Sequence, residues 1–379
     1  MNTAVIAVAG AGKTERLAKA VLCEPSTSRT IVLTYTTTNQ LEDSLRIASS
    51  APTPYDLPRV TGWRSFLLNE IVKPYLPKLY PNVSLQGLAF NDPESFQYLK
   101  GYQRYISADG WAYPSLFGKL AFDVIKASGY RALQRIEHLY DSIYIDEGQD
   151  LRGNDLCVLE ALLKSSITIH IVLDPRQSTL STAARDKKYR EKYQSANIIN
   201  LFRLWEKAGR LTIETMNETW RFTPQIAHFS DLIFEDDLNL GETVSNVPLR
   251  GRHDGLFLIS KSEVAEYSNK YQATALAVRK SQEIDAYESI NFGLSKGMSR
   301  DDVVIVATAP IEELLTKGKR LLPSSACGLY VAVTRARYSV AIAVEQPNEV
   351  ARAMHSPDSI WKDIPIRLLG AETGSSSAQ

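Results

Sequence analysis

Short apolar runs rich in β-branched residues recur along the chain, and longer helix-like stretches separate them. Such runs form the strands of parallel sheets, which are buried on both faces, and the stretches between them supply the covering helices. The pattern therefore predicts an α/β fold with parallel sheets flanked by helices. A polar stretch separates the first four runs from the last three, which indicates two lobes. The seven runs span residues 5–9, 31–34, 143–145, 169–173, 256–260, 303–307 and 340–344.

The organisation of the chain follows from these runs. We assign residues 1–200 to the first lobe and residues 201–366 to the second. Within the first lobe, residues 67–122 are aromatic and irregular in pattern, which predicts a small helical insertion. The small, polar residues of 367–379 predict a disordered tail.

The composition limits the partners and the compartment. The 379 residues carry 43 basic and 43 acidic side chains, so a nucleic-acid contact would have to be a local patch. The three cysteines are far apart and form no CxxC pair, which argues against a disulfide framework or a zinc site and fits a reducing cytoplasm. No apolar run approaches the roughly 20 residues that span a bilayer, so we expect no membrane partner.

The segment AVAGAGKT, residues 7–14, follows the first run and precedes a helix-like stretch. Glycines in such a turn let backbone N–H groups surround phosphate oxygens at a helix N-terminus. We expect Lys13 to reach the terminal phosphates of a nucleotide and Thr14 to ligate Mg²⁺. The strict pattern has a glycine where this chain has Ala7, so a chance turn is the alternative. The predicted phosphate-binding residues are Ala9, Gly10, Ala11, Gly12, Lys13 and Thr14.

The segment IYIDEGQD, residues 143–150, places two carboxylates directly after a buried strand. Ligands of open α/β sheets bind at the carboxyl ends of the strands. We expect Asp146 to hold Mg²⁺ through water and Glu147 to deprotonate an attacking water molecule. The alternative is a helix N-terminus, where acidic residues favour the helix dipole. The phosphate-binding segment upstream favours the catalytic interpretation.

Three further side chains are candidates for contact with the γ-phosphate of a nucleotide. Gln177 follows the run at 169–173 and could hydrogen-bond that phosphate, or could belong to a polar turn. Arg221 and Arg335 are cations of the kind that stabilise charge growing on a phosphoryl group. Both belong to the predicted second lobe, so they would reach a nucleotide on the first lobe only if the lobes close. The alternative for each is a solvated surface arginine.

In their order and in their residues, these segments resemble the motifs of superfamily 1A DNA helicases of the UvrD/Rep kind. The resemblance extends from about Ala4 to Val344. The resemblance implies two RecA-like P-loop NTPase lobes, ATP hydrolysis with ATP and Mg²⁺ as cofactors, and single-stranded DNA as a partner. Its DExQD and GDxxQS motifs fall on Asp146, Glu147, Gln149, Asp150, Asp174, Gln177 and Ser178. Its nucleotide-contacting residues in the second lobe fall on Arg221, Lys296, Gly297 and Arg335, with Ser295 beside them.

The resemblance also implies contacts to the backbone of single-stranded DNA. These fall on Thr34, Thr36, Asn39, Thr61, Ser65 and Phe66. Trp63 lies among them and is either a platform for a base or a core residue. The aromatic residues that follow the family's glutamine, and the family's large second-lobe insertion, have no counterpart in this sequence. The missing aromatic residues predict that binding of the strand is weak or is supplied by other residues.

The compact layout is similar to the helicase-like subunit of Gabija-type antiphage systems, which works beside an OLD-family nuclease carrying a TOPRIM domain. Two functions stay open. The first is a Mg²⁺-dependent, DNA-stimulated ATPase that translocates on or remodels single-stranded DNA. The second is an ATP-dependent DNA-sensing subunit that regulates a partner nuclease. A nucleotide-binding protein without turnover is disfavoured, because Lys13, Asp146, Glu147, Arg221 and Arg335 are all present.

Overall fold

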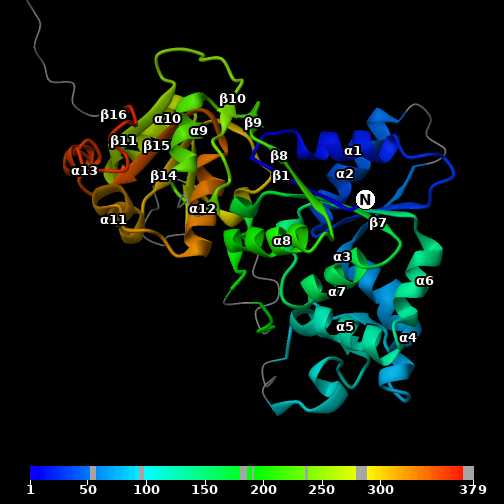
Figure 1. The fold of residues 1–379 in the computed structure, drawn as a ribbon. Helices are drawn as coiled ribbons and strands as arrows, with labels where there is room; N and C mark the ends of the chain where they lie inside the picture. The colour runs from blue at the N-terminus through cyan, green and yellow to red at the C-terminus, as the bar shows by residue number, and fades with distance from the viewer. Residues whose placement is uncertain are drawn as a thin grey trace, which may run out of the picture. The chain divides into compact units, whose positions relative to one another are not determined.

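The structure is a computed structural model that describes residues 1–51, 57–93, 98–179, 186–189, 192–234, 238–278 and 288–369. The chain forms two compact units, which we describe separately (Figure 1). The first unit comprises Met1–Ala7, Gly12–Pro175 and Leu180–Met216. The second comprises Val8–Ala11, Arg176–Thr179 and Asn217–Gln379. Two short segments that follow strands of the first unit therefore belong to the second.

The first unit is built on a parallel sheet of six strands in the order β3-β2-β6-β7-β1-β8. Its central strands are apolar and β-branched, and Ile31, Val32 and Leu33 have no exposed surface. Because all six strands run the same way, their carboxyl ends meet at one edge of the sheet. The strands are β1 (Thr3–Ala7), β2 (Thr30–Thr34), β3 (Arg59–Gly62), β6 (Ser142–Ile145), β7 (Thr168–Leu173) and β8 (Thr212–Met216).

Helices flank this sheet (Figure 1). In α5, the buried residues Leu120 and Val124 recur one helical turn apart, which is the spacing of an amphipathic helix. The helices are α1 (Lys13–Leu22), α2 (Thr37–Ser50), α3 (Trp63–Phe66), α5 (Phe117–Ala127), α6 (Arg131–Leu139), α7 (Asn154–Leu163) and α8 (Ile198–Lys207), with short turns η5 (Gly148–Asp150), η6 (Pro175–Gln177) and η7 (Ser195–Asn197).

The predicted insertion at residues 67–122 contains helical segments and also a two-stranded parallel pair that the sequence did not predict. Each strand of that pair has only two residues, too few for a recognisable pattern. The described segments are η1 (Leu67–Val72), α4 (Lys73–Leu79), β4 (Gly87–Leu88), η3 (Gly101–Arg104), β5 (Trp111–Ala112) and η4 (Pro114–Leu116).

The second unit has its own parallel sheet of six strands, in the order β13-β12-β14-β15-β11-β16. A short parallel pair, β9 (Glu218–Thr219) and β10 (Val244–Ser245), precedes it. The sheet strands are β11 (Gly255–Ser260), β12 (Thr274–Ala277), β13 (Ser289–Asn291), β14 (Arg300–Val306), β15 (Ala336–Val344) and β16 (Ile366–Leu368). The helices are α9 (Pro224–Asp231), α10 (Val264–Tyr271), α11 (Ala309–Lys317), α12 (Pro323–Val333) and α13 (Pro347–Met354), with turns η9 (Lys261–Glu263) and η10 (Gly293–Ser295).

The predicted fold class is confirmed: both units are parallel sheets flanked by helices, as in RecA-like lobes. The boundary differs from the predicted position at residue 200, because α8 and β8 belong to the first unit and β8 pairs with β1. Residues 367 and 368 form part of β16 and pair with β11, although we assigned them to the tail. The rest of the predicted tail, residues 370–379, lies outside the described residues.

In the part of the chain that the structure describes, no helix is both long enough and apolar enough to cross a membrane.

We predict that Trp361→Ala destabilises the second unit by about 3–5 kcal/mol, the usual cost of truncating a large core aromatic. Trp361 has no exposed surface, its indole Nε1–H donates to the Leu314 carbonyl at 3.0 Å, and its ring lies 4.8 Å from that of Phe229. Denaturant unfolding measures the loss. Trp220→Ala is the matched control, because Trp220 is 54% exposed. Equal losses for the two variants would contradict the prediction.

Candidate nucleotide site and nucleic-acid contacts

The loop between β1 and α1 has a backbone that fits a phosphate group. Gly10 and Gly12 have φ angles of 77° and 76°, which glycine adopts without steric cost. The helix α1 begins at Lys13, and no side chain among the described residues caps it. The first N–H groups of a helix and its dipole favour an anion at this position. Lys13 and Thr14 are half-buried in that first turn.

The start of this loop packs against the segment that carries Arg221, and all of these residues belong to the second unit. The hydroxyl of Thr219 donates to the Ala9 carbonyl at 2.8 Å, and the N–H of Trp220 donates to the Gly10 carbonyl at 3.1 Å. A Cβ atom on Gly10 would lie 2.4 Å from the Cβ of Arg221. Glycine is therefore required at position 10 both by the backbone angle and by this close approach.

Sequence reasoning assigned a role to Arg221 and none to the residue before it. The side chain of Trp220 is 54% exposed, while its backbone N–H is bonded to the loop. An exposed indole held beside a phosphate loop can stack on a base. An aromatic residue directly before the arginine was the available signal.

The carboxylates after β6 are held in a strained and well-connected turn. Glu147 has a φ angle of 55°, a left-handed conformation that is uncommon for a residue with a side chain. Its N–H donates to Asp146 Oδ1 at 2.9 Å, and its carboxylate accepts from the Gln149 amide. The amide oxygen of Gln149 accepts from the N–H of Asp174 at 3.0 Å. Gln149 thus connects the turn after β6 to the turn after β7.

A third carboxyl group, that of Asp43 on α2, contacts Asp146, lies within the electrostatic influence of Glu147 and was not predicted. Asp43 is 1% exposed, and burial, followed by the charges of Asp146, Glu42 and Glu147, raises its pKa to about 9. The Oδ2 atom of Asp43 has no hydrogen-bond partner among the described residues. Asp43 lies in a polar stretch without a motif, so no sequence signal marked it.

This crowding of carboxyl groups fits a hard divalent cation, which takes oxygen ligands and offsets their charge. Within the described residues, no group of three acidic, histidine or cysteine side chains could hold an ion by itself. Mg²⁺ is usually bound through one or two carboxylates together with waters and substrate phosphates. Thr14 and Asp146 are the residues that would hold it.

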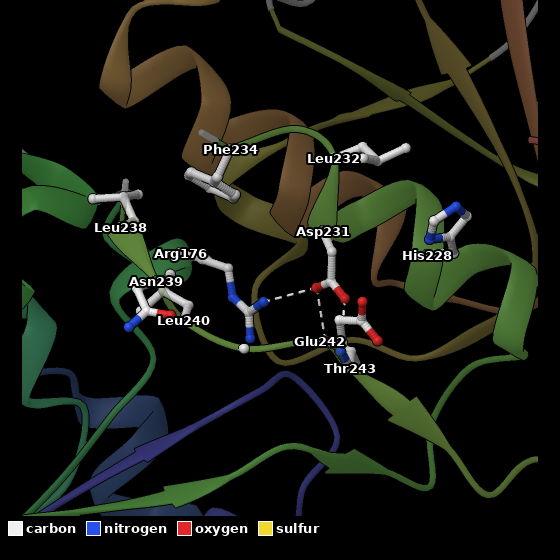
Figure 2. Close-up of a pocket in the computed structure, with 11 residues that line it drawn as sticks. Arg176, His228, Asp231, Leu232, Phe234, Leu238, Asn239, Leu240, Glu242 and Thr243 are labelled. Atoms are coloured by element: carbon white, nitrogen blue, oxygen red, sulfur yellow. Dashed lines mark hydrogen bonds and ion pairs between the residues drawn. The ribbon is translucent and has the colours of Figure 1, made fainter. Parts of the chain in front are cut away.

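The segment after β7 is buried and connected to α9. Gln177 is 5% exposed, and the neighbouring Arg176 is 3% exposed. Arg176 pairs with Asp231 at 2.9 Å, and Asp231 also accepts from the N–H and the hydroxyl of Thr243 (Figure 2). Beside this ion pair lies a cavity of about 420 Å³ lined by His228, Phe234 and Leu238 among others. The burial and the charge pairing fix the backbone that carries Gln177.

The remaining second-unit candidates lie in different environments. Arg335 is 1% exposed, and its guanidinium donates to the carbonyls of Val331 and Met298 at 3.0 and 3.2 Å. Lys296 is half-buried after η10, and the exposed Gly297 has a φ angle of 88°. Contact of these residues with a nucleotide stays a prediction.

The predicted DNA contacts divide into buried and accessible side chains. Trp63 and Phe66 are each 1% exposed, and the Trp63 Nε1–H donates to the buried Asp155 carboxylate at 2.9 Å. Both aromatics are core residues, which favours the core interpretation of Trp63 over a platform for a base, and contact of Phe66 with a DNA backbone stays a prediction. Thr34 and Thr61 are also buried, at 1% and 7%.

The other predicted contacts remain available at the carboxyl edge of the first sheet. The hydroxyl of Thr36 accepts from the N–H of Asn39 at 3.2 Å and caps α2. Thr36, Asn39 and Ser65 are half-buried or more exposed. Polar groups at this edge suit contact with a phosphate backbone.

No family model and no curated protein matches the chain. Among solved structures, it is similar to the PRRSV helicase, with a TM-score of 0.45, 16% identity, and coverage of 91% of this chain and 52% of that one. It is similar to arterivirus nonstructural protein 10, a helicase, with a TM-score of 0.47, 12% identity and coverage of 92% and 61%. The complex of an arterivirus nonstructural protein 10 with DNA gives 0.47, 12%, 93% and 63%.

The chain thus spans between about half and just under two thirds of the length of these helicases. At such low identity the similarity concerns the fold alone. The resemblance to UvrD/Rep helicases and to Gabija subunits stays a prediction, and a function has to be argued from this chain's own residues.

We predict that Gly10→Ala is more destabilising than Gly12→Ala. Both substitutions put a side chain at a positive φ angle, which costs about 1–2 kcal/mol. At Gly10 the new Cβ would also lie 2.5 Å from Thr219 Oγ1, whereas at Gly12 nothing lies within 4 Å. Such overpacking adds about 1–3 kcal/mol. Denaturant unfolding of the two variants measures the difference, and equal losses would show that the close contact is absent in solution.

Proposed function

We propose that the chain is a Mg²⁺-dependent ATPase of the superfamily 1A helicase type, stimulated by DNA, that translocates on or remodels single-stranded DNA. One observation carries the proposal. The phosphate loop, the carboxylate pair and the Gln177 segment follow β1, β6 and β7, which are parallel strands of one sheet. The carboxyl ends of parallel strands lie at the same edge of a sheet, so these three segments begin at one edge. Phosphoryl transfer needs phosphate-binding groups, carboxylates and a contact to the γ-phosphate together.

Each residue has a role that its surroundings support. The backbone of Gly10 and Gly12 and the ammonium of Lys13 bind the phosphates. Glu147 accepts the proton of the attacking water, and the amide of Gln149 fixes the orientation of its carboxylate. Thr14 and Asp146 would hold a Mg²⁺ ion bound with ATP, and that ion would supply positive charge to the phosphates.

The two arginines are not equally well placed to act. Arg221 lies directly against Gly10 of the phosphate loop, and this contact supports it as the arginine that stabilises the transferred phosphoryl group. Arg335 donates to two backbone carbonyls of its own unit. Arg335 is also only 1% exposed, so a phosphate would reach its guanidinium only if the surrounding residues moved.

We expect Glu147→Gln to lower the ATP turnover rate by roughly 10²–10⁴-fold, the usual contribution of a general base. ATP affinity should stay close to that of the parent, because the phosphate loop is unchanged. Turnover is measured by phosphate release and affinity by titration with a labelled nucleotide. Glu349→Gln, an exposed change on α13, is the control and should behave as the parent does. Full turnover by Glu147→Gln would rule out the proposed mechanism.

We expect single-stranded DNA to raise the turnover rate severalfold and to do so less effectively at high salt. The accessible candidates at the sheet edge are polar, so binding would depend on phosphate contacts, whose strength falls with salt. The measurement compares turnover with single-stranded DNA, single-stranded RNA, duplex and no polynucleotide at two salt concentrations. Turnover that no polynucleotide changes would exclude a nucleic-acid motor.

A second candidate function is an ATP-dependent DNA-sensing subunit of an antiphage nuclease complex, with an OLD-family TOPRIM nuclease as the partner. The burial of Trp63 and Phe66 favours it, because base stacking on aromatics normally supplies about 1–3 kcal/mol per base to strand grip. A strand-separation assay with the lone chain distinguishes the two functions. Robust unwinding supports the motor, while DNA-stimulated turnover without unwinding supports the sensor.

A further inference from the structure

Tyr330 connects several parts of the second unit through one side chain. It lies on α12 and has no exposed surface. Its hydroxyl accepts a hydrogen bond from the Ala9 N–H at 3.2 Å. The guanidinium of Arg176 lies 4.9 Å from the centre of its ring, and the ring of Phe234 lies 5.7 Å away at an edge-on angle of 68°.

The hydroxyl of Tyr330 and that of Thr219 together hold the backbone of Ala9. Tyr330 accepts from its N–H, and Thr219 donates to its carbonyl at 2.8 Å. Ala9 is itself fully buried. Since a buried backbone N–H left without a partner costs the free energy of its desolvation, the two hydroxyls fix two successive peptides. Thr219 fixes the Ala9–Gly10 peptide, and Tyr330 fixes the Val8–Ala9 peptide before it. The direction in which the phosphate loop leaves β1 depends on these two peptides.

The ring of Tyr330 supports the residue directly before Gln177. The guanidinium of Arg176 lies over the ring. It also pairs with Asp231 through Nη1 (Figure 2). A guanidinium over an aromatic face is attracted to the ring electrons, and more strongly when water is excluded. Arg176 is therefore held on one side by charge and on the other by the tyrosine ring.

We propose that Tyr330 is a positioning residue for the nucleotide. Through its hydroxyl it sets the start of the phosphate loop, and through its ring it sets the segment of Gln177. The inference rests on the proposed ATP site and adds to it a residue that touches neither phosphate nor metal. This positioning role differs from simple core packing. The role depends on the hydroxyl of Tyr330, whose removal would leave the ring and its packing in place.

The test uses Tyr330→Phe in the full chain, since this change keeps the ring and its contacts and removes only the hydroxyl. The control is Tyr267→Phe. Tyr267 is 4% exposed, and its hydroxyl bonds His253 Nε2 at 2.8 Å in another part of the same unit. Both variants thus lose one buried hydroxyl. Two quantities are measured: amide hydrogen exchange of the peptide covering Val8–Ala11 without nucleotide, and the affinity for ATP with Mg²⁺.

We expect Tyr330→Phe to speed exchange at Val8–Ala11 by about threefold to tenfold and to weaken ATP binding by a similar factor, as for the loss of one hydrogen bond. Tyr267→Phe should change neither quantity. If Tyr330→Phe does not fold, Thr219→Val removes the other bond to Ala9 and should give the same two changes.

Each result decides between the alternatives. Faster exchange with unchanged ATP affinity would overturn the positioning role and leave a structural one. Parent-like behaviour in both measurements would overturn the inference altogether. A parent protein that fails to bind ATP would refute the proposed function, and in that case the exchange measurement still reports whether Tyr330 holds the loop.

Discussion

The close approach of Gly10 to the backbone around Trp220 is the constraint on which the rest of the site depends. A residue with a Cβ atom at this position would overlap Arg221, and its φ angle would be strained. The same peptide region is fixed by hydroxyl groups of Thr219 and Tyr330. The loop backbone is therefore determined before any ligand arrives. A preformed phosphate loop keeps the ordering entropy low when a nucleotide binds.

The carboxyl groups around the predicted metal site are electrostatically unfavourable. Asp43, Asp146 and Glu147 bring carboxyl groups together in a region where water is largely excluded, and the pKa of Asp43 rises to about 9 as a result. Such a cluster is unfavourable unless a proton or a cation offsets the charge. The strained φ angle of Glu147 adds a second unfavourable feature at the same turn. Unfavourable features that gather at one turn are typical of functional sites.

The sequence predicted the central strands and the glycine turn before α1 because their patterns are local. An apolar, β-branched run and a pair of glycines can each be recognised within about ten residues of sequence. The edge strands β3 and β8 were missed because they are short and only partly buried. Asp43 was missed because its role depends on contact with Asp146, about a hundred positions away, which no local pattern records. The cation–π contact between Arg176 and Tyr330 likewise joins residues that are far apart in the sequence, so no local pattern predicts it.

Approximate free energies decide between two interpretations of Trp63, as a core residue or as a platform for a base. Taking it out of the core would cost about 3–5 kcal/mol, and it would also remove the hydrogen bond to Asp155, whose pKa burial already raises to about 6. Stacking one base on it would return about 1–3 kcal/mol. The core position is therefore the more favourable one for Trp63. Binding of a strand at this edge would then depend on polar groups such as Thr36 and Asn39, which would contact phosphates without distinguishing bases.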